Sequence, residues 1–281
     1  MNERCDESSA WHTARMARNV SDERVELGHA IFNFAEPHAG HEIAWNRYYE
    51  RDHLIAAAAC APWTISTQRW VAPRRHRALR YPRENPIAQP FDKGSFLAGI
   101  WVQRGRFDDQ QEWVAAQMKI LGEQGRNFDA RDVLTSAGHD LLGAVFRDED
   151  GVPAELALDR RYPGLVLAWL ERTPDQTLEA LRDTVIDRVL PGFLEKSPTA
   201  QALCFTPLPK ASWWPKAAPE VAGVGDRLLI AFFVECDPLD VWDERFAGLG
   251  AALEAGGCGH TLFVAPFVPV VPGVDPDLAE L

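Results

Sequence analysis

The order of hydrophobic segments constrains the fold of this chain most, because the same order occurs twice. In each copy, the spacing of apolar side chains predicts strand, helix, strand, strand, helix, strand. The first copy is expected to have strands at 29–34, 63–71, 95–103 and 140–146 and helices at 42–60 and 108–123. The second is expected to have strands at 164–171, 200–205, 227–234 and 260–266 and helices at 173–190 and 240–254. Corresponding elements lie roughly 130 residues apart, which indicates a repeat of architecture.

Each copy predicts a four-stranded antiparallel sheet with two helices on one face, a ferredoxin-like unit whose other face needs cover. Two such sheets packed face to face within one chain satisfy this need, whereas independent units would each expose an apolar sheet face. We therefore predict an α+β fold in which two ferredoxin-like βαββαβ repeats form a dimeric α+β barrel. The predicted divisions are a polar N-terminal arm (1–26), a first half (27–150), a second half (160–268) and an extended C-terminal tail (269–281).

Local signals mark the helix ends and the long loops of the second copy. Thr173 is a plausible N-cap with Pro174 at the first helical position, and Pro191-Gly192 predicts the end of that helix. Residues 72–94 and 207–224 form long loops, the second of which contains Trp213 and Trp214. Loops of this length are often lids or binding elements.

Composition excludes several classes of function. The formal charge of -12 over 281 residues argues against a nucleic-acid binder, which normally presents a basic face. No apolar run approaches the roughly 18 residues of a membrane span, and the start of the chain has no apolar signal-peptide core. The five cysteines are scattered and form no C-x-x-C pair, so neither a disulfide framework nor a zinc knuckle is indicated. We expect a cytoplasmic protein without a membrane or nucleic-acid partner.

One predicted helix carries a polar stripe where a core helix would be apolar. Asn46, Tyr49 and His53 lie at i, i+3 and i+7 and so share one face of an α-helix. The segment 46–53, N-R-Y-Y-E-R-D-H, followed by Pro62 and a strand, resembles the N-R-W-Y-x-x-x-H signature of EthD-like proteins in the dimeric α+β barrel superfamily. Tyr48 stands where that family generally has tryptophan. The equivalent helix of the second copy has no histidine, which places a single site in the first half.

The resemblance implies a catalytic role for His53, which is the histidine position of the motif. Imidazole accepts or donates protons near neutral pH, and Tyr49 and Asn46 would position it or polarise a substrate oxygen. The alternative is that His53 only caps the helix C-terminus, where the helix dipole favours a cation. Expected substrate-binding residues are Tyr48, Arg47, Trp70 and Trp101. Most of the ten tryptophans are nonetheless expected to be core residues.

Other clusters give weaker signals. His38 and His41 form an H-x-x-H pair, but no convincing Asp or Glu ligand accompanies them, so we predict no metal site. The arginine-rich segment 74–83 either clamps an anion or is a solvated loop that balances nearby acids. No phosphate-binding, nicotinamide or flavin motif is present, which favours chemistry without a cofactor.

EthD-like and related barrels act on hydrophobic or phenolic small molecules, often by proton transfer. The resemblance therefore implies a cofactor-independent lyase or isomerase acting on a hydrophobic, aromatic small molecule. Two alternatives stay open: a non-catalytic protein that binds a hydrophobic metabolite or haem, and a cofactor-free monooxygenase. A homodimer is compatible with either class, because exposed helices and edge strands remain free to pair.

Overall fold

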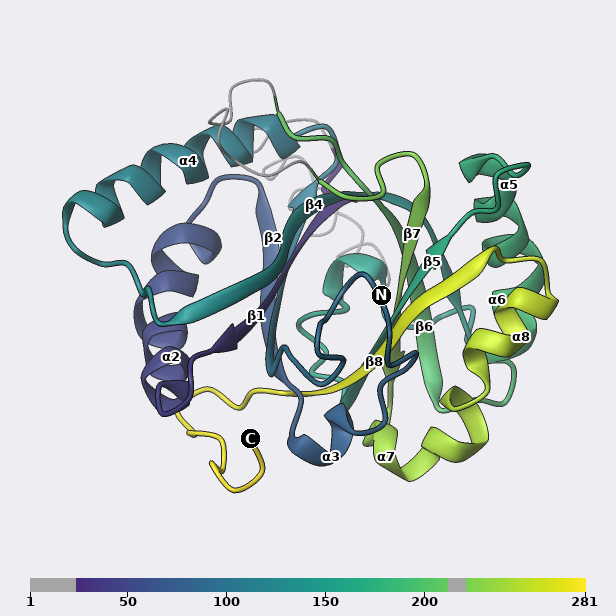
Figure 1. The fold of residues 1–281 in the computed structure, drawn as a ribbon. Coiled ribbons are helices and arrows are strands. Elements are labelled where there is room, and N and C mark those ends of the chain that lie inside the picture. The colour runs from purple at the N-terminus through teal and green to yellow at the C-terminus, as the bar shows by residue number, and fades with distance from the viewer. Residues whose placement is uncertain (1–23, 212–220) are drawn as a thin grey trace, which may run out of the picture.

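The computed structural model describes residues 24–211 and 221–281, and eight antiparallel strands close into a barrel (Figure 1). The predicted N-terminal arm therefore lies almost wholly outside the described residues, as do Trp213 and Trp214. The strands are β1 (Leu27–Pro37), β2 (Thr64–Val71), β3 (Phe96–Gln103), β4 (Arg131–Phe146), β5 (Gly164–Glu171), β6 (Thr199–Pro207), β7 (Arg227–Val234) and β8 (His260–Pro269).

The order of strands around the barrel repeats, as the sequence predicts. The first half runs β4-β1-β3-β2 and the second half runs β8-β5-β7-β6. These are the same order if each strand of the second half is matched to its counterpart in the first. The halves join where β2 pairs with β8 at Val71↔Val268 and where β4 pairs with β6 at Gly143↔Cys204. The predicted α+β fold with two repeated half-barrels is confirmed.

Helices cover the outer face of each half-barrel (Figure 1). In the first half, α2 (Glu42–Tyr48) continues as two π-helical segments, Tyr49–His53 and Ile55–Ala59, and α4 (Phe107–Glu123) lies beside them. In the second half the helical segments are α5 (Leu178–Asp183), a π-helical segment Thr184–Val189, α6 (Leu190–Leu194), α7 (Pro238–Val241), a second π-helical segment Trp242–Phe246, and α8 (Leu249–Ala255). Among the described residues, no helix is long and apolar enough to cross a membrane.

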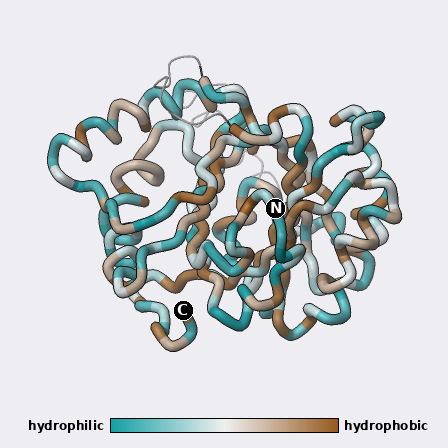
Figure 2. The backbone as a smooth tube through the Cα atoms, viewed as in Figure 1, coloured by the Kyte–Doolittle hydropathy of each residue, from teal (hydrophilic) through white to brown (hydrophobic). Residues whose placement is uncertain are grey.

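Side chains fill the interior of the barrel, because alternate residues of every strand point inward. This core includes Trp70, Trp101, Phe34, Phe205 and Phe267, all nearly inaccessible to solvent. A second core layer lies between the outer face of β5–β8 and the helices of the second half. Figure 2 shows the corresponding hydrophobic segments along the strands, with more hydrophilic segments toward the outside.

Two predicted helix ends in the second half are wrong. Thr177, not Thr173, is the N-cap, because its hydroxyl accepts the Ala180 N–H at 3.1 Å, while Thr173 begins a turn whose carbonyl accepts from Gln176. The helical path also continues through Pro191 to Leu194. Proline is tolerated there because it lies in the first turn of α6, where its missing N–H costs no hydrogen bond.

The strand predicted at 140–146 is also too short. β4 begins at Arg131, and its first part pairs with β1 from Pro37↔Arg131 to His29↔Asp140. This early part of β4 is more polar than a core strand, and it faces solvent over much of its length. Cross-strand pairing with β1, which periodicity within 131–139 does not reveal, therefore defines the strand.

The arginine-rich segment 74–83 is held against the barrel by buried contacts of Arg80. It contains the helical turn α3 (Arg74–Arg77), and Arg80 is only 2% exposed. The Arg80 guanidinium donates to the carbonyl oxygens of Lys93 and Gly94 and lies over the rings of Phe34 and Phe267. Buried in this way, Arg80 ties the loop to the barrel core.

Candidate functional site

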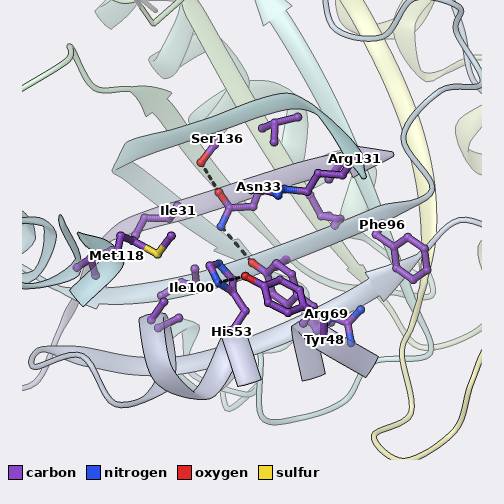
Figure 3. Close-up of a pocket in the computed structure, with 18 of the residues that line it drawn as sticks. Ile31, Asn33, Tyr48, His53, Arg69, Phe96, Ile100, Met118, Arg131 and Ser136 are labelled. Atoms are coloured by element: carbon purple, nitrogen blue, oxygen red, sulfur yellow. Dashed lines mark hydrogen bonds between the residues drawn. The ribbon is translucent and has the colours of Figure 1, made fainter. Parts of the chain in front are cut away.

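A cavity of about 240 Å³ lies outside the barrel, between the sheet of the first half and its helices (Figure 3). Inward-pointing residues of β1 belong to the barrel core, so the alternate residues of that strand face the helices. The cavity is lined from the sheet by Ile31, Asn33, Ala98 and Ile100 and from the helices by Tyr48, Tyr49, His53, Ala57 and Met118. Its walls are mainly apolar, and a polar cluster of Tyr48, Tyr49 and His53 lies where α2 continues into the π-helical segment.

The change from α-helix to π-helix after Tyr48 determines which side chains meet. A π-helix bonds residue i to i+5, so residues five apart come onto one face. The Tyr48 hydroxyl lies 3.1 Å from His53 Nδ1, and the two rings stack with centroids 5.4 Å apart. The Tyr49 ring also contacts the His53 ring, edge-on at 5.0 Å. His53 is thus held between two tyrosines.

The hydrogen bonds of Tyr48 determine which nitrogen of His53 carries the proton. The Tyr48 hydroxyl is 3.0 Å from the carbonyl oxygen of Arg126, which only accepts, so Tyr48 donates its single proton there. The hydroxyl oxygen must then accept from His53, which places a proton on Nδ1. Within the described part of the chain, Nε2 has no hydrogen-bond partner. His53 therefore presents an unprotonated Nε2 for a ligand.

Burial keeps His53 neutral. Desolvation, and secondarily the charge of Arg131, lowers the pKa of His53 from 6.5 to about 4. The carboxylate of Asp52 acts in the opposite direction, but it is bound to Arg126 in an ion pair. A neutral imidazole at physiological pH can accept a proton, whereas an imidazolium at a helix end would act only as a cation.

A series of two hydrogen bonds connects the helix to the sheet across the cavity (Figure 3). The Asn33 amide donates to the Tyr49 hydroxyl at 3.3 Å, and the Asn33 carbonyl oxygen accepts from Ser136. Burial raises the pKa of Tyr49, so its hydroxyl stays protonated at neutral pH. Tyr49 can therefore donate a hydrogen bond to a ligand oxygen.

Removal of the Tyr48 hydroxyl is expected to release the tautomer of His53 while the aromatic wall of the cavity stays in place. Tyr48→Phe keeps the aromatic ring but leaves His53 Nδ1–H without its acceptor. We expect the tautomer protonated on Nε2 to appear beside the one protonated on Nδ1, which nitrogen-15 NMR of the imidazole measures, with unchanged circular dichroism as the control. A spectrum identical to that of the wild-type protein would show that Tyr48 does not set the tautomer.

Four residues expected at the site do not line this cavity. Asn46 is buried, but its side chain is directed to the C-terminal tail, where its amide lies 3.4 Å from Asp275. Arg47 is exposed and forms an ion pair with Asp275. Trp70 and Trp101 fill the barrel interior, on the opposite face of the sheet. Asn46 does not share a helix face with His53 as predicted, because the π-helical segment after Tyr48 has more residues per turn than an α-helix.

The structure adds residues that sequence reasoning missed. Asn33, Arg69, Arg131 and Ser136 all line the cavity and come from three different strands, β1, β2 and β4. A polar residue between two phenylalanines, as at Asn33, and an arginine within an otherwise uncharged strand, as at Arg69, are signals that could have identified two of them. Arg131 and Ser136 gave no such signal, because that part of β4 was not predicted.

The H-x-x-H pair does not assemble with His53. His38 is exposed and lies 3.3 Å from Asp132, and His41 contacts the Phe128 ring. Within residues 24–211 and 221–281, no group of three or more His, Cys, Asp or Glu side chains is placed to hold a metal ion.

Comparison with solved structures gives neighbours across most of the chain. An anthrone oxidase-like protein superposes with a TM-score of 0.53 at 10% identity, over 90% of this chain and 97% of the other. A predicted monooxygenase of Fusobacterium nucleatum gives 0.49 at 8% identity, over 91% and 96%. A DyP-type peroxidase of Mycobacterium smegmatis gives 0.47 at 12% identity, over 90% and 97%.

The superposition on the anthrone oxidase-like protein shows a shared fold, and the class of fold of this chain is the α+β barrel described above. No family model matches the sequence, and no curated protein is similar to it in sequence. Identities near 10% show the fold alone, so the function has to be inferred from the residues of the site.

Proposed function

We propose that this protein is a cofactor-independent enzyme that uses neutral His53 to take a proton from a hydrophobic, aromatic small molecule. The reaction would be of the lyase or isomerase type, in which the same imidazole returns the proton at another atom or to a leaving group. Tyr49 would donate a hydrogen bond to the substrate oxygen. The apolar wall formed by Ile31, Ile100 and Met118 would exclude water from the developing anion.

One observation carries this proposal: the unpartnered Nε2 of a neutral histidine beside an apolar cavity. The Tyr48 bond fixes the opposite nitrogen as the donor, and burial keeps the ring uncharged. A histidine that merely capped the helix would instead gain from being cationic. The motif N-R-Y-Y-E-R-D-H supports a further proposal, that the chain is related to EthD-like proteins. The repeated order of strands supports its origin by fusion of two half-barrel units.

The proposal is tested by proton exchange, which requires no knowledge of the net reaction. The protein is incubated in deuterated water with a panel of hydroxylated aromatic and polyketide-like compounds, and mass spectrometry detects deuterium at carbon. We expect at least one compound to exchange with wild-type protein and not with His53→Ala. Exchange that persists in His53→Ala would exclude His53 as the base.

Cofactor-free oxygenation is the second candidate, because the same anion formed from an electron-rich phenol can react with oxygen. The name of one structural neighbour, an anthrone oxidase-like protein, makes oxygen uptake worth measuring alongside exchange. Consumption of oxygen that tracks product formation would favour the oxygenase over the lyase or isomerase. Tight binding without any chemistry, or a Soret band after addition of haemin, would favour a binding protein.

The pH dependence of turnover is expected to reflect the lowered pKa of His53. Because that pKa is about 4 rather than 6.5, the base stays unprotonated through the neutral range. We expect kcat/KM to be level through pH 6.5 and to fall only as the pH approaches 4. Folding needs a parallel check by circular dichroism, since the unfolded chain binds a proton below pH 6.5 that folded His53 does not. An activity loss centred on 6.5 in folded protein would contradict this assignment.

A further inference from the structure

The charged side chains that line the cavity are all of one sign. Two arginines, Arg69 on β2 and Arg131 at the start of β4, line it, and its described lining includes no aspartate or glutamate. In Figure 3, Arg131 enters from the sheet side while His53 and Tyr48 lie on the helix side. A largely apolar cavity with two guanidinium groups and no counter-ion is an unusual and costly arrangement.

Arg69 is buried without full compensation. It is 6% exposed, and one of its terminal nitrogens donates to the carbonyl oxygen of Asn46 at 3.2 Å. The other, Nη2, is buried and has no hydrogen-bond partner among the described residues. Burial lowers the pKa of Arg69 to about 10, so the group remains charged at neutral pH, and Glu50 attracts it without forming an ion pair.

Arg131 also lacks a carboxylate partner among the described residues. It is half-buried, its guanidinium lies 5.4 Å from the centre of the Trp45 ring, and no described acid is within ion-pair distance. Asp132, which follows Arg131 in the chain, is bound to Lys93, and Asp52, which acts on the same histidine, is bound to Arg126. The cation at the cavity wall is therefore left for a ligand.

We infer that the cavity is built for aromatic molecules that carry an acidic oxygen, either a carboxylate or a phenolate, which Arg131 binds with support from Arg69. The flat body of such a molecule would lie against the apolar wall at Ile31 and Ile100. This inference rests on the proposed function for the location of the site, and it adds the charge of the substrate.

An anion bound to Arg131 would also change the pKa of His53. Among the groups that face His53, Arg131 lowers its pKa and Asp52 raises it, while Tyr48 binds its Nδ1. An anion bound to Arg131 neutralises the cation and leaves the opposing charge of Asp52 in place. His53 would therefore become a stronger base when an acidic ligand is bound than when a neutral one is.

The test compares acids with their neutral amides: benzoate, 4-hydroxybenzoate and naphthalene-2-carboxylate, each against the matching amide, by isothermal titration calorimetry. Wild-type protein is expected to bind at least one acid about tenfold or more tighter than its amide, since hydrogen bonds to charged groups are the stronger ones. Arg131→Gln should remove that preference, whereas Arg131→Lys should keep part of it. Arg51→Gln, which removes an exposed cation of the same region, should leave it intact.

Any of three results would overturn the inference. These are equal binding of acid and amide, an acid preference that survives in Arg131→Gln, and binding of no acid at all. The proposed function is tested separately by deuterium exchange, because binding does not require turnover. An acid preference with exchange unaffected by His53→Ala would retain the inference and reject His53 as the base. Loss of exchange in His53→Ala without an acid preference would retain the base and reject the anion site.

Discussion

Replacement of His53 by alanine is expected to lower turnover about a hundredfold to ten-thousandfold, which is the range that a positioned general acid or base contributes. The loss should fall on kcat rather than KM, because the cavity keeps its apolar walls and both arginines. Initial rates on a compound found by deuterium exchange measure the effect. Neither tyrosine can substitute for the imidazole: the Tyr49 hydroxyl has a raised pKa, and the Tyr48 hydroxyl donates its hydrogen bond to the backbone carbonyl oxygen of Arg126.

A matched control separates the role of His53 from a general effect of losing a histidine. His41 precedes the same helix, is exposed, and contacts only the edge of this region through Phe128. His41→Ala should keep full turnover. If His41→Ala and His53→Ala reduce turnover alike, the effect comes from the helix and not from a base in the cavity.

Replacement of Trp101 by alanine is expected to cost about 3–5 kcal/mol of the free energy of unfolding, the usual cost of a large core truncation. Trp101 has no exposed surface, packs against Phe32 and Phe205, and donates its indole N–H to the Ala154 carbonyl at 2.9 Å. Its loss opens a cavity in the barrel interior and leaves that carbonyl without its donor. Chemical denaturation followed by circular dichroism measures the change.

Two further variants make the Trp101 result specific. Trp101→Phe should cost less, because the ring still fills most of the space and only the hydrogen bond is lost. Ile120→Ala, at a position of α4 that is 47% exposed, should change the free energy of unfolding by about 0.5 kcal/mol or less. A Trp101→Ala protein as stable as wild type would mean that the barrel interior is not the packed core described above.

The fold could be predicted from sequence because burial imposes a pattern on nearly every strand. Strands such as β7, which reads R-L-L-I-A-F-F-V, are buried on both faces and are unmistakable as apolar runs. The early part of β4 was missed because it is polar and is defined by pairing with β1. Helix ends failed at Thr173 and Pro191, where the same residue types also fit turns and first helical turns.

The site was only partly predictable, for a geometric reason. The sequence predicted Tyr48, Tyr49 and His53, which line the cavity, and Asn46, which does not, because the prediction assumed 3.6 residues per turn. A π-helical segment after Tyr48 changes which side chains meet, and nothing in the local sequence marks it. Asn33 and Arg131, which lie across the cavity from this cluster, come from β1 and β4, so only the assembled sheet brings them to the cavity.

Direct observation of the His53 imidazole by nitrogen-15 NMR tests the central claim most directly, because it requires no substrate. The spectrum of His53→Ala assigns the signals, and a pH series then gives the protonation state of each ring nitrogen. We predict a neutral ring at pH 7 with its proton on Nδ1 and a pKa of about 4. A ring that is protonated on Nε2, or that titrates at its ordinary value of 6.5, would contradict the assignment of His53 as the neutral base of this site.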